Sequence, residues 1–387
     1  MCMKVKDQVI TSLIDNDLYT FTVGQIAFNS FPSAKVKYKF INRGKTNFPK
    51  NFAKEIRHQL KLMSKLRFTQ YENVYLKSLG YFTDEYLTWL SHYQFNPNEL
   101  VIKQNGGNLT IEICGIWVRT IMWEVPLLAL ISELYYKMTN KRKVDGWLGK
   151  ITQKAQNLSS NGCLWIDFGT RRRFDFETQQ SVVFSMKSYK GFLGTSNVLL
   201  AFQNSVPPNG TMSHQGPMAM MARYGAKYAN KMWMTHWLNF YKVKLLTYLP
   251  DTFTTEVFLR DFANTDAVVW DLRQDSGDPV EWMETILAHY KMLNIPTNNK
   301  KFIFSDGLSD ESYIKLSLKY RKHAIIIGGI GTSISNDCGH PPLSIVIKLS
   351  SANFGLGWVD VVKLSDSKGK YTGTKKAVEL VKKQLGI

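Results

Sequence analysis

The chain of 387 residues is long enough for one large domain with a sizeable core and a second, smaller domain. Hydrophobic residues make up 44% and charged residues 21% of the sequence, which is typical of a soluble globular protein. No apolar run approaches the roughly 20 residues of a membrane span. The segment from Met1 to Asp7 is polar and lacks the apolar core of a signal peptide, so we expect a cytoplasmic protein.

The formal net charge of +18 raises the question of an anionic partner. Lysine and arginine are spread along the whole chain without a basic tract that interleaves aromatic residues, so we expect no nucleic-acid partner. Phosphorylated small substrates would benefit from such a positive field. The scattered cysteines form no C-x-x-C pair, which predicts reduced thiols rather than a zinc or redox site; they are Cys2, Cys114, Cys163 and Cys338.

The first 140 residues alternate between helical and strand-like patterns. An Asn-Gly-Gly turn from Asn105 separates two apolar runs, which indicates a β-hairpin. Pro126 is tolerated because it would lie in the first turn of a helix. The predicted elements, in chain order, are a helix over Tyr19–Asn29, a strand over Val36–Phe40, a helix over Asn51–Leu66, hairpin strands over Leu100–Lys103 and Leu109–Ile113, and a helix over Val125–Tyr136.

From about residue 150 onward, short apolar β-type runs alternate with helical segments, which is the rhythm of a parallel sheet. Four runs end in polar or glycine-rich sequence, and parallel α/β barrels place their chemistry at the carboxyl ends of their strands. These runs are Leu164–Ile166 before Asp167, Ala267–Trp270 before Asp271, Phe302–Phe304 before Ser305, and Ile325–Ile327 before Gly328. A strand over Ser344–Leu349 and a lysine-rich helix over Lys375–Leu385 follow.

The stretch from Asp271 to Pro279 is the most informative of these strand ends. Its single arginine, Arg273, has a planar guanidinium group that suits an anion, and the nearby carboxylates can hold hydroxyl groups or a metal ion. This combination indicates a sugar-phosphate site. Asp275 has a second interpretation, as the N-cap of the helix that follows Pro279.

Glycine-rich loops follow the last two of the four runs. Gly307 lies three residues beyond one strand, and Gly329-Ile330-Gly331-Thr332 follows the other. Glycine permits close approach of the backbone, and helix N-termini favour anions. Because barrel folds often bind phosphate in their last two loops, we expect a phosphate to meet these amides.

In its motifs, the chain resembles the nicotinate phosphoribosyltransferase family over nearly its whole length. The motifs, in chain order, are Asp15-Asn16-Asp17-Leu18-Tyr19, Trp123-Glu124-Val125-Pro126-Leu127-Leu128, DFGTRRRF from Asp167, GTSNV from Gly194, Gly210-Thr211-Met212-Ser213-His214, DTFTTEVFLRDF from Asp251, RQDSGDP from Arg273, FSDGL from Phe304, GIGT from Gly329 and PLSIVIKL from Pro342. Ten motifs in a fixed order make this resemblance very specific.

The resemblance implies both a reaction and a fold. The reaction joins nicotinate to 5-phosphoribosyl 1-pyrophosphate (PRPP) in NAD salvage, gives nicotinate mononucleotide and pyrophosphate, and is coupled to ATP hydrolysis through a phosphohistidine. The fold is α/β: an irregular parallel α/β barrel of the type II phosphoribosyltransferase kind over residues 141–345. An N-terminal α/β sandwich domain, residues 1–140, is completed by the C-terminal segment, residues 346–387.

The resemblance also implies a nicotinate pocket. Phe168 would stack on one face of the pyridine ring, and Tyr19 of the neighbouring subunit would cover the other face, which predicts a homodimer with a shared active site. Arg273, with Arg171, would bind the carboxylate, and Thr211 would donate its hydroxyl to it. Arg172 and Arg173 are expected to be structural or solvated.

Ser196 is the position that separates nicotinate from nicotinamide. Nicotinamide-using relatives have an aspartate here, which accepts from the amide nitrogen and would repel a carboxylate. Serine is neutral and can donate, and a site built for one hydrogen-bond pattern can reject the other by a factor on the order of 10⁴. The resemblance therefore implies nicotinate as the base.

For PRPP, the resemblance implies a set of hydroxyl- and phosphate-binding residues around Asp275. Asp275 would hold the ribose hydroxyls and stabilise the positive charge that develops on the sugar. Arg171 would also contact phosphate. The expected PRPP-binding residues are Arg171, Asp275, Ser276, Gly277, Asp306, Gly307, Gly329, Gly331 and Thr332.

His214 is implied as the catalytic residue that accepts the γ-phosphoryl group of ATP, with Asp251 orienting its ring. Mg²⁺ is expected to bind through the substrate phosphates, not through protein side chains. Many bacterial relatives have glutamate after this histidine, whereas this chain has Gln215.

Two other functions compete with this interpretation. A nicotinamide phosphoribosyltransferase is disfavoured by Ser196. A basic nucleic-acid-binding protein on the same scaffold is disfavoured because Arg273, Asp275 and His214 are intact, and it would show steeply salt-dependent binding to DNA or RNA.

Overall fold

The structure is a computed structural model of the chain and describes residues 8–387. The polar N-terminus and Cys2, to which two expectations refer, lie outside the described residues. The other three cysteines, Cys114, Cys163 and Cys338, are free. Within residues 8–387, no helix combines the length and the apolar character that crossing a membrane requires.

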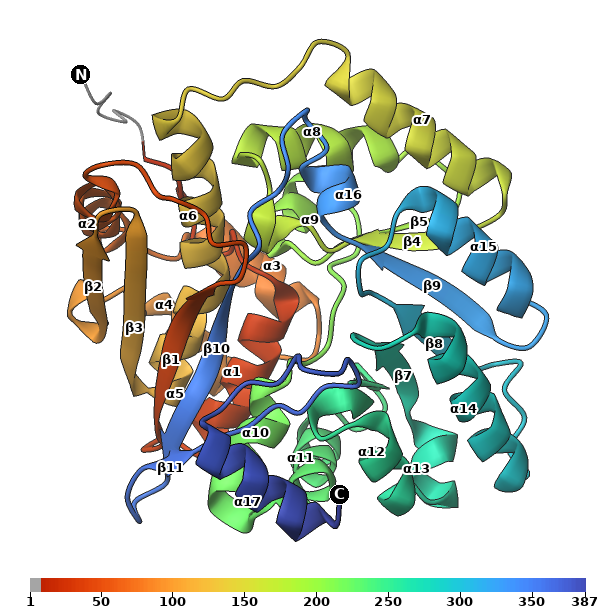
Figure 1. Cartoon of the computed structure of the whole chain (residues 1–387). Coiled ribbons are helices and arrows are strands. Elements are labelled where there is room, and N and C mark those ends of the chain that lie inside the picture. Colours follow the sequence, from red (N-terminus) through yellow and green to blue (C-terminus); the bar gives the residue numbers. More distant parts are fainter. Residues whose placement is uncertain (1–7) are drawn as a thin grey trace.

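An antiparallel sheet of five strands joins the beginning and the end of the chain (Figure 1). Its strand order is β11-β10-β1-β3-β2. The bounds are β1 Lys35–Asn42, β2 Leu100–Asn105, β3 Asn108–Ile116, β10 Ile345–Asn353 and β11 Val359–Asp360. The strand β1 forms because the buried Val36 and Tyr38 alternate with lysines, of which Lys35 and Lys39 are exposed and Lys37 is half-buried.

The predictions for this region are confirmed. The two hairpin strands pair around Asn105 and Asn108, and the last predicted strand, β10, pairs with β1. The helices that pack on this sheet and around it are α1 Leu18–Ser30, α2 Phe52–Met63, α3 Gln70–Ser78, α4 Asp84–Ser91, α5 Trp117–Thr120 and α6 Glu124–Met138.

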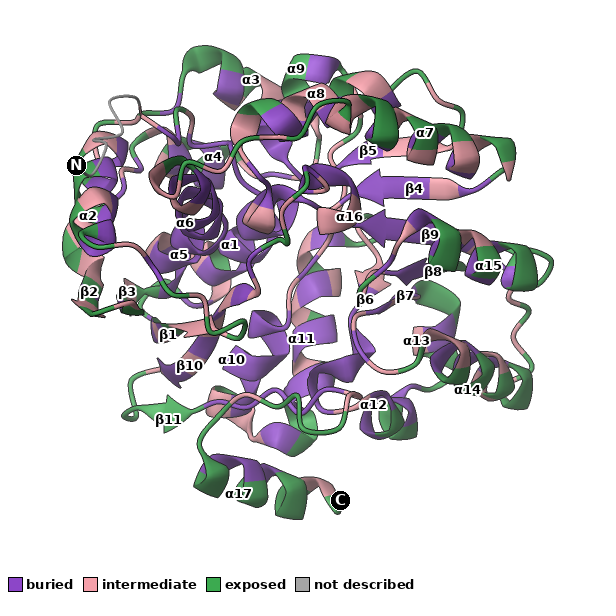
Figure 2. Ribbon diagram, turned by 45° about the horizontal axis from the view of Figure 1, so that its top comes forward, coloured by how far each residue is buried: buried purple, intermediate pink, exposed green. Residues whose placement is uncertain are grey.

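A parallel sheet of six strands forms the second layer, in the order β5-β4-β9-β8-β7-β6. The bounds are β4 Leu164–Asp167, β5 Phe192–Thr195, β6 Thr247–Tyr248, β7 Asp271–Gln274, β8 Lys301–Phe304 and β9 Ile325–Ile330. The strands are buried and the outer faces of their helices are exposed (Figure 2), as parallel sheets require. Within residues 8–387, no hydrogen-bonded ladder joins β5 to β6, so the closed barrel stays a prediction.

Helices follow the parallel strands, as the alternating pattern predicts. Their bounds are α7 Trp147–Ser160, α8 Phe176–Met186, α9 Val198–Asn204, α10 Gln215–Tyr224, α11 Ala226–Tyr241, α12 Thr255–Asp261, α13 Asn264–Val269, α14 Pro279–Met292, α15 Asp310–Tyr320, α16 Thr332–Ser335 and α17 Lys375–Leu385. The C-terminal helix has the bounds that the sequence predicts.

The strand predicted over Ala267–Trp270 is wrong. These residues belong mainly to the short helix α13, and β7 begins only at Asp271. The two valines that suggested a buried strand are exposed, at 63% for Val268 and 38% for Val269, and only Ala267 of the helix is buried. The strand is built instead from Leu272 and Gln274, which are buried, so Arg273 lies within the strand and not beyond it.

The segment over residues 361–374, here called the strap, runs between β11 and α17. Its first residues are buried and include Val361, Val362 and Leu364. The Leu364 amide donates to the Thr252 carbonyl at 2.8 Å, and the Gly277 amide donates to Ser367 Oγ at 3.0 Å. The strap is therefore bound to the loops at the carboxyl ends of the parallel strands. The domain boundaries at residues 140 and 345 stay a proposal.

Candidate active site

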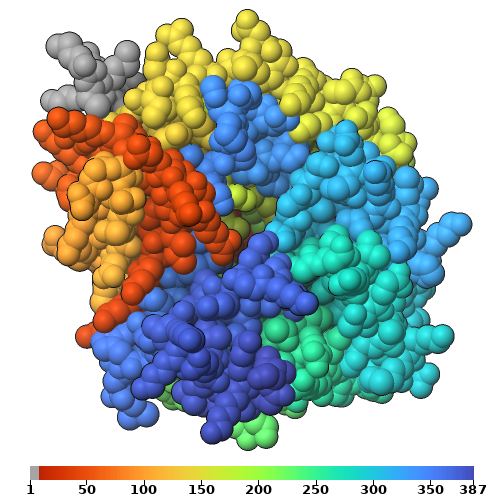
Figure 3. All heavy atoms as spheres, viewed as in Figure 1, coloured from red at the N-terminus to blue at the C-terminus, as the bar shows by residue number. Residues whose placement is uncertain are grey.

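Three cavities meet at Arg171 and Asp275, at the carboxyl ends of the parallel strands. Figure 3 shows the hollow in the centre of one face of the molecule, between the red N-terminal part, the blue C-terminal part and the cyan part of the chain. Arg171 lies on the short helix after β4, and Asp275 follows β7 directly. The parallel sheet thus brings two loops, far apart in sequence, to one point.

The first cavity, here the glycine pocket, has a volume of about 530 Å³ and is lined by Phe168, Arg273, Gly307 and the loop from Gly329 to Thr332. The guanidinium of Arg273 lies over the Phe168 ring, 4.9 Å from its centroid. A Cβ atom at Gly329 would lie 2.5 Å from the Phe168 ring, so only glycine permits this ring position. The pocket offers a flat aromatic ring, a planar cation and a glycine-rich loop.

Arg273 and Asp275 bind each other at the edge of this pocket. Arg273 Nη2 donates to Asp275 Oδ1 at 2.9 Å, and Arg273 Nε donates to Ser305 Oγ at 2.8 Å. Burial would raise the pKa of Asp275, but Arg273 and the neighbouring His214 and Lys363 outweigh burial, and the pKa lies well below its usual value. Asp275 therefore presents a carboxylate to all three cavities at neutral pH.

The second cavity, here the cation chamber, has a volume of about 160 Å³ and brings together cations from four parts of the chain. Burial and the charges of Arg171 and Arg43 lower the pKa of Arg172, and burial and Lys363 lower the pKa of Lys348 to about 8. Such strain between like charges is relieved when an anion binds. The six basic residues that line the chamber are Arg43, Arg171, Arg172, Lys348, Lys363 and Lys370, against the acids Asp275 and Asp306.

The third cavity, here the histidine pocket, has a volume of about 50 Å³ and contains His214, which lies immediately before α10. Its Nδ1 lies 3.0 Å from Thr252 Oγ1, and its Nε2 lies 3.0 Å from Asp275 Oδ2 and 2.8 Å from Lys363 Nζ. Burial and the charge of Lys363 lower the pKa of His214, so the imidazole is neutral at pH 7.

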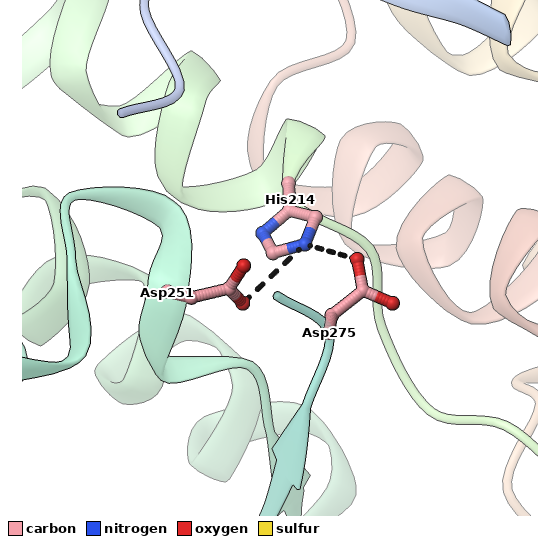
Figure 4. A group of neighbouring side chains, drawn as sticks. All are labelled: His214, Asp251 and Asp275. Atoms are coloured by element: carbon pink, nitrogen blue, oxygen red, sulfur yellow. Dashed lines mark hydrogen bonds and ion pairs between the residues drawn. The ribbon is translucent and has the colours of Figure 1, made fainter. Parts of the chain in front are cut away.

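Asp251 lies farther from the imidazole than expected. Its Oδ1 is 3.6 Å from His214 Nε2 (Figure 4), whereas its Oδ2 accepts from Ser276 Oγ at 2.6 Å and binds Lys363 Nζ at 2.8 Å. The partner of Nδ1 is thus the hydroxyl of Thr252, the next residue in the chain.

His214, Asp251 and Asp275 have ligand atoms within 4.8 Å of one another, as a metal site requires. The ammonium of Lys363 lies 2.8 Å from His214 Nε2 and 3.6 Å or less from both carboxylates, so it takes the position that a metal ion would need. These side chains fit a buried ammonium group better than a metal ion.

Gln215 points away from the imidazole of His214. Its Oε1 accepts from Tyr38 Oη at 2.8 Å and from Trp117 Nε1 at 3.2 Å, and its Nε2 donates to Glu124 Oε2 at 3.4 Å. Glutamine in place of glutamate therefore changes the contact between α10 and the antiparallel sheet, and the hydrogen bonds to His214 come from other residues.

Ser196 and Thr211, two predicted nicotinate-binding residues, have hydrogen-bond partners inside the protein. Ser196 Oγ donates to Asp17 Oδ1 at 2.7 Å, and Thr211 Oγ1 donates to the Thr247 carbonyl at 2.6 Å. Neither residue lines the three cavities. The structure therefore brings neither hydroxyl to the pocket of Phe168.

Tyr19 and Phe168, the two predicted stacking residues, line different cavities of one chain. Tyr19 lines the histidine pocket, close to Glu124 and Arg171, and Phe168 lines the glycine pocket. Within a single chain, the two rings do not face one another across one cavity. A sandwich of the base between them would need Tyr19 of the partner subunit.

The remaining predicted residues differ in how they meet the cavities. Ser276, Asp306 and Gly307 line the cation chamber. Gly277 lines none of the three cavities, and its amide donates to the strap. The alternative role of Asp275 as an N-cap is wrong, since Asp278 Oδ1 accepts from both Val280 and Glu281 amides and caps α14.

The two arginines expected to be structural or solvated differ from each other. Arg173 is fully buried and donates to both oxygens of Asp15 at 2.7 Å, so its role is structural. Arg172 instead lines the glycine pocket and the cation chamber. Sequence reasoning also missed Thr252 and the other cations of the chamber. Thr252 could have been predicted from its place in the motif that begins at Asp251. Lys363 and Lys370 lie in none of the family motifs, so their sequence offered no reason to select them.

The comparisons with known proteins agree with this geometry. The family model of the nicotinate phosphoribosyltransferase N-terminal domain matches residues 14–132, and the model of the nicotinate phosphoribosyltransferase family matches residues 163–387. A nicotinate phosphoribosyltransferase of Chromohalobacter salexigens is 38% identical over 98% of this chain and 99% of its own length. One of Desulforapulum autotrophicum is 39% identical over 94% of this chain and 96% of its own length.

Solved structures give the same result. The crystal structure of nicotinate phosphoribosyltransferase from Porphyromonas gingivalis superposes with a TM-score of 0.95 at 34% identity and covers 98% of this chain and all of that chain. The Vibrio cholerae enzyme superposes with a TM-score of 0.91 at 27% identity, over 99% of this chain and 95% of that chain. With both family models matched and these relatives aligned over nearly its whole length, the chain belongs to the nicotinate phosphoribosyltransferase family.

Proposed function

We propose that this protein transfers the phosphoribosyl group of PRPP to nicotinate, giving nicotinate mononucleotide and pyrophosphate for NAD salvage, with ATP hydrolysis coupled through His214. The observation that carries the proposal is the meeting of the glycine pocket and the cation chamber at Asp275. A flat base with one carboxylate fits the first, and a polyphosphate fits the second. Asp275 lies where the two substrates would meet.

Nicotinate fits the glycine pocket through Phe168 and Arg273. The guanidinium over the Phe168 ring offers a cation for the carboxylate, and the half-buried ring, which lines the pocket, offers stacking worth about 0.5–1.5 kcal/mol. Arg273 lies over the Phe168 ring and also donates to Asp275. A base bound next to Arg273 would therefore lie close to the Asp275 carboxylate. Ser196 then acts on the base only after it releases Asp17 or through the partner subunit.

PRPP fits the boundary between the cavities. Its 5′-phosphate would meet the amides of Gly307 and of the loop from Gly329 to Thr332, and its pyrophosphate would meet the cations of the chamber. The Asp275 carboxylate, kept ionised by Arg273, would stabilise positive charge on the ribose as the bond to pyrophosphate breaks. Mg²⁺ would bind through the substrate phosphates, since Lys363 takes the position between the protein's own acids.

His214 fits the role of phosphoryl acceptor because its neutral imidazole borders both Asp275 and the cations. Transfer of the γ-phosphoryl group of ATP is mostly positioning and charge neutralisation, which the chamber provides. Hydrolysis of the phosphohistidine would then couple ATP use to product formation. The homodimer belongs to the same proposal: Tyr19 of the partner subunit would cover the base opposite Phe168 after leaving the buried position beside Glu124 and Arg171 that Tyr19 has within one chain.

The test is product formation from PRPP and nicotinate with Mg²⁺, with and without ATP, for the wild type and His214→Ala. We expect nicotinate mononucleotide in both conditions, with stimulation by ATP only in the wild type. Product without any effect of ATP would retain the transferase and reject the phosphohistidine. Absence of product from nicotinate in both proteins would reject the proposed function.

A further inference from the structure

The strap places one buried cation, Lys363, directly against the imidazole of His214. Lys363 Nζ lies 2.8 Å from His214 Nε2 and 2.8 Å from Asp251 Oδ2, and the residue is only 6% exposed. It lies between the apolar anchors Val362 and Leu364, which are both buried. The position of the ammonium is therefore fixed by packing on either side of it.

The same strap also fixes the residue on the other side of the imidazole ring. The Leu364 amide donates to the carbonyl of Thr252, whose hydroxyl lies 3.0 Å from His214 Nδ1. Asp366 accepts from the amide and the hydroxyl of Thr255, three residues beyond Thr252. One segment of chain thus positions the groups that face both ring nitrogens.

Two donors cannot face each other at 2.8 Å, so the Lys363 contact restricts the proton of the neutral ring. Lys363 Nζ lies 2.8 Å from a carboxylate oxygen of Asp251 and 3.6 Å from one of Asp275, and an ammonium group can only donate. Nε2 must then accept, and the single ring proton lies on Nδ1, where Thr252 Oγ1 can accept it. Asp275 Oδ1 accepts from Arg273 and Ser305, and Oδ2, which lies 3.0 Å from Nε2, has the Lys363 ammonium 3.6 Å away as an alternative to a proton from Nε2.

We infer that Lys363 is a positioning residue for His214: its ammonium group donates to Nε2 in the site without substrate and thereby keeps the ring proton on Nδ1, so that Nε2 carries a lone pair and not a proton. The inference rests on the proposed use of His214 as phosphoryl acceptor. It assigns a role in this reaction to a residue of the C-terminal strap. The strap belongs neither to the motif around His214 nor to the motif around Asp275.

This tautomer makes the phosphoryl step simple. When ATP binds, the Lys363 ammonium leaves Nε2 and donates to an oxygen of the γ-phosphoryl group. The freed Nε2 lone pair then forms a bond to the γ-phosphorus while the bond from that phosphorus to the β,γ-bridging oxygen breaks and ADP leaves with the electron pair. The ring proton stays on Nδ1 beside Thr252, so no proton has to move. In the other tautomer, Nε2 would have to lose its proton to Asp275 first, and in Ser-His-Asp enzymes a wrong tautomer costs about 10⁴ in rate.

The test reads the tautomer directly, by two-bond ¹H–¹⁵N correlation spectra of full-length protein labelled with [¹⁵N]histidine. The spectrum of His214→Gln identifies the His214 signals among the seven histidines. Lys363→Met alone would leave Asp251 buried and unpaired, and the protein could unfold. The neutral pair Lys363→Met with Asp251→Asn avoids this cost, and Asp251→Asn alone is its matched control.

We expect the proton on Nδ1 in the wild type and in Asp251→Asn, and on Nε2 in the neutral-pair variant. Phosphoenzyme formed from [γ-³²P]ATP should fall about 10²-fold in the neutral-pair variant relative to Asp251→Asn. Lys370→Met, which removes another strap lysine, should keep the wild-type tautomer.

Three outcomes would overturn the inference: a proton on Nε2 in the wild type, a shift of the proton in Asp251→Asn alone, or an Nδ1 proton in the neutral-pair variant. Failure of the proposed function is a separate result. A wild-type protein that forms no nicotinate mononucleotide would reject that function, while the NMR measurement would still decide the role of Lys363.

Discussion

The strand-end loops of the parallel sheet and the cation chamber differ in how they are built. The loops take Phe168, Asp275 and the glycine-rich segment from strand-to-helix junctions of one sheet, and Arg273 lies just before its junction, within β7. The chamber takes Arg43 from the end of β1, Lys348 from β10, and Lys363 and Lys370 from the strap. The strand-end loops thus belong to the parallel sheet alone, whereas the chamber forms where the two sheets and the strap meet.

This difference teaches that the two regions should fail in different ways. Under the proposed function, residues of the strand-end loops would contact the base and the reacting sugar, so their loss should lower the rate of the chemical step or weaken binding of the base. Residues of the chamber would contact the pyrophosphate of PRPP, so their loss should mainly weaken PRPP binding.

Asp275→Asn should have the largest effect, a loss of about 10²–10³-fold in kcat, because the neutral amide cannot stabilise positive charge on the ribose. Steady-state kinetics with saturating PRPP and nicotinate measure it. Asp278→Asn is the matched control, because asparagine also caps a helix and Asp278 caps α14 outside the cavities. Equal losses of kcat in both variants would contradict the assignment of Asp275.

Arg173→Met should destabilise the fold by about 3–5 kcal/mol, because it leaves the buried carboxylate of Asp15 without its partner. Thermal and urea unfolding measure the change. Arg173→Met combined with Asp15→Asn should recover most of the lost stability. A fold as stable as the wild type in the single variant would show that this arginine is not structural and would weaken the contrast with Arg172.

Lys348→Met should raise the KM for PRPP about tenfold and change kcat less, because it removes one cation that faces phosphate. The charged form of Lys348 is present below pH 8 and is lost as the pH rises through the pKa of about 8. The wild-type KM for PRPP should therefore rise above pH 8, and Lys348→Met should lack this rise. A pH profile of the same shape in both proteins would contradict the role of Lys348.

Gly329→Ala should have the smallest effect, a rise of about fivefold in the KM for nicotinate with little change in that for PRPP. The added Cβ would lie 2.5 Å from the Phe168 ring and displace it. Gly331→Ala is the control, since its Cβ would make only an ordinary contact of 3.4 Å with the Phe168 carbonyl. A larger rise in the KM for PRPP than in the KM for nicotinate would contradict the assignment of Phe168 to the base pocket.

The strand-end residues were predictable because their signals are local. A strand that ends in Asp167 or Phe304, followed by polar or glycine-rich residues, predicts its own place in a parallel sheet. The error at Ala267–Trp270 has a physical cause, because the valines of a short exposed helix look like a buried strand when burial is unknown. Arg273 and Asp275 were nevertheless predicted as site residues, because both belong to the motif RQDSGDP, which does not depend on where the strand begins.

The chamber residues were not predictable because nothing in their local sequence reports a contact made across the fold. Lys363 and Lys370 are two of many lysines in a basic C-terminal region, and long-range contacts such as the hydrogen bond from the Leu364 amide to the Thr252 carbonyl bring the strap to His214. The same holds for the hydroxyls of Ser196 and Thr211, whose partners Asp17 and the Thr247 carbonyl are distant in sequence. Long-range packing decides these contacts.

The most direct measurement offers nicotinate and nicotinamide together, at equal concentration, to the purified protein with PRPP, Mg²⁺ and ATP, and separates the products by chromatography. The geometry of the glycine pocket, with its cation over Phe168, predicts nicotinate mononucleotide and pyrophosphate as the dominant products. Nicotinamide mononucleotide as the main product, or no nucleotide from either base, would contradict the proposed function.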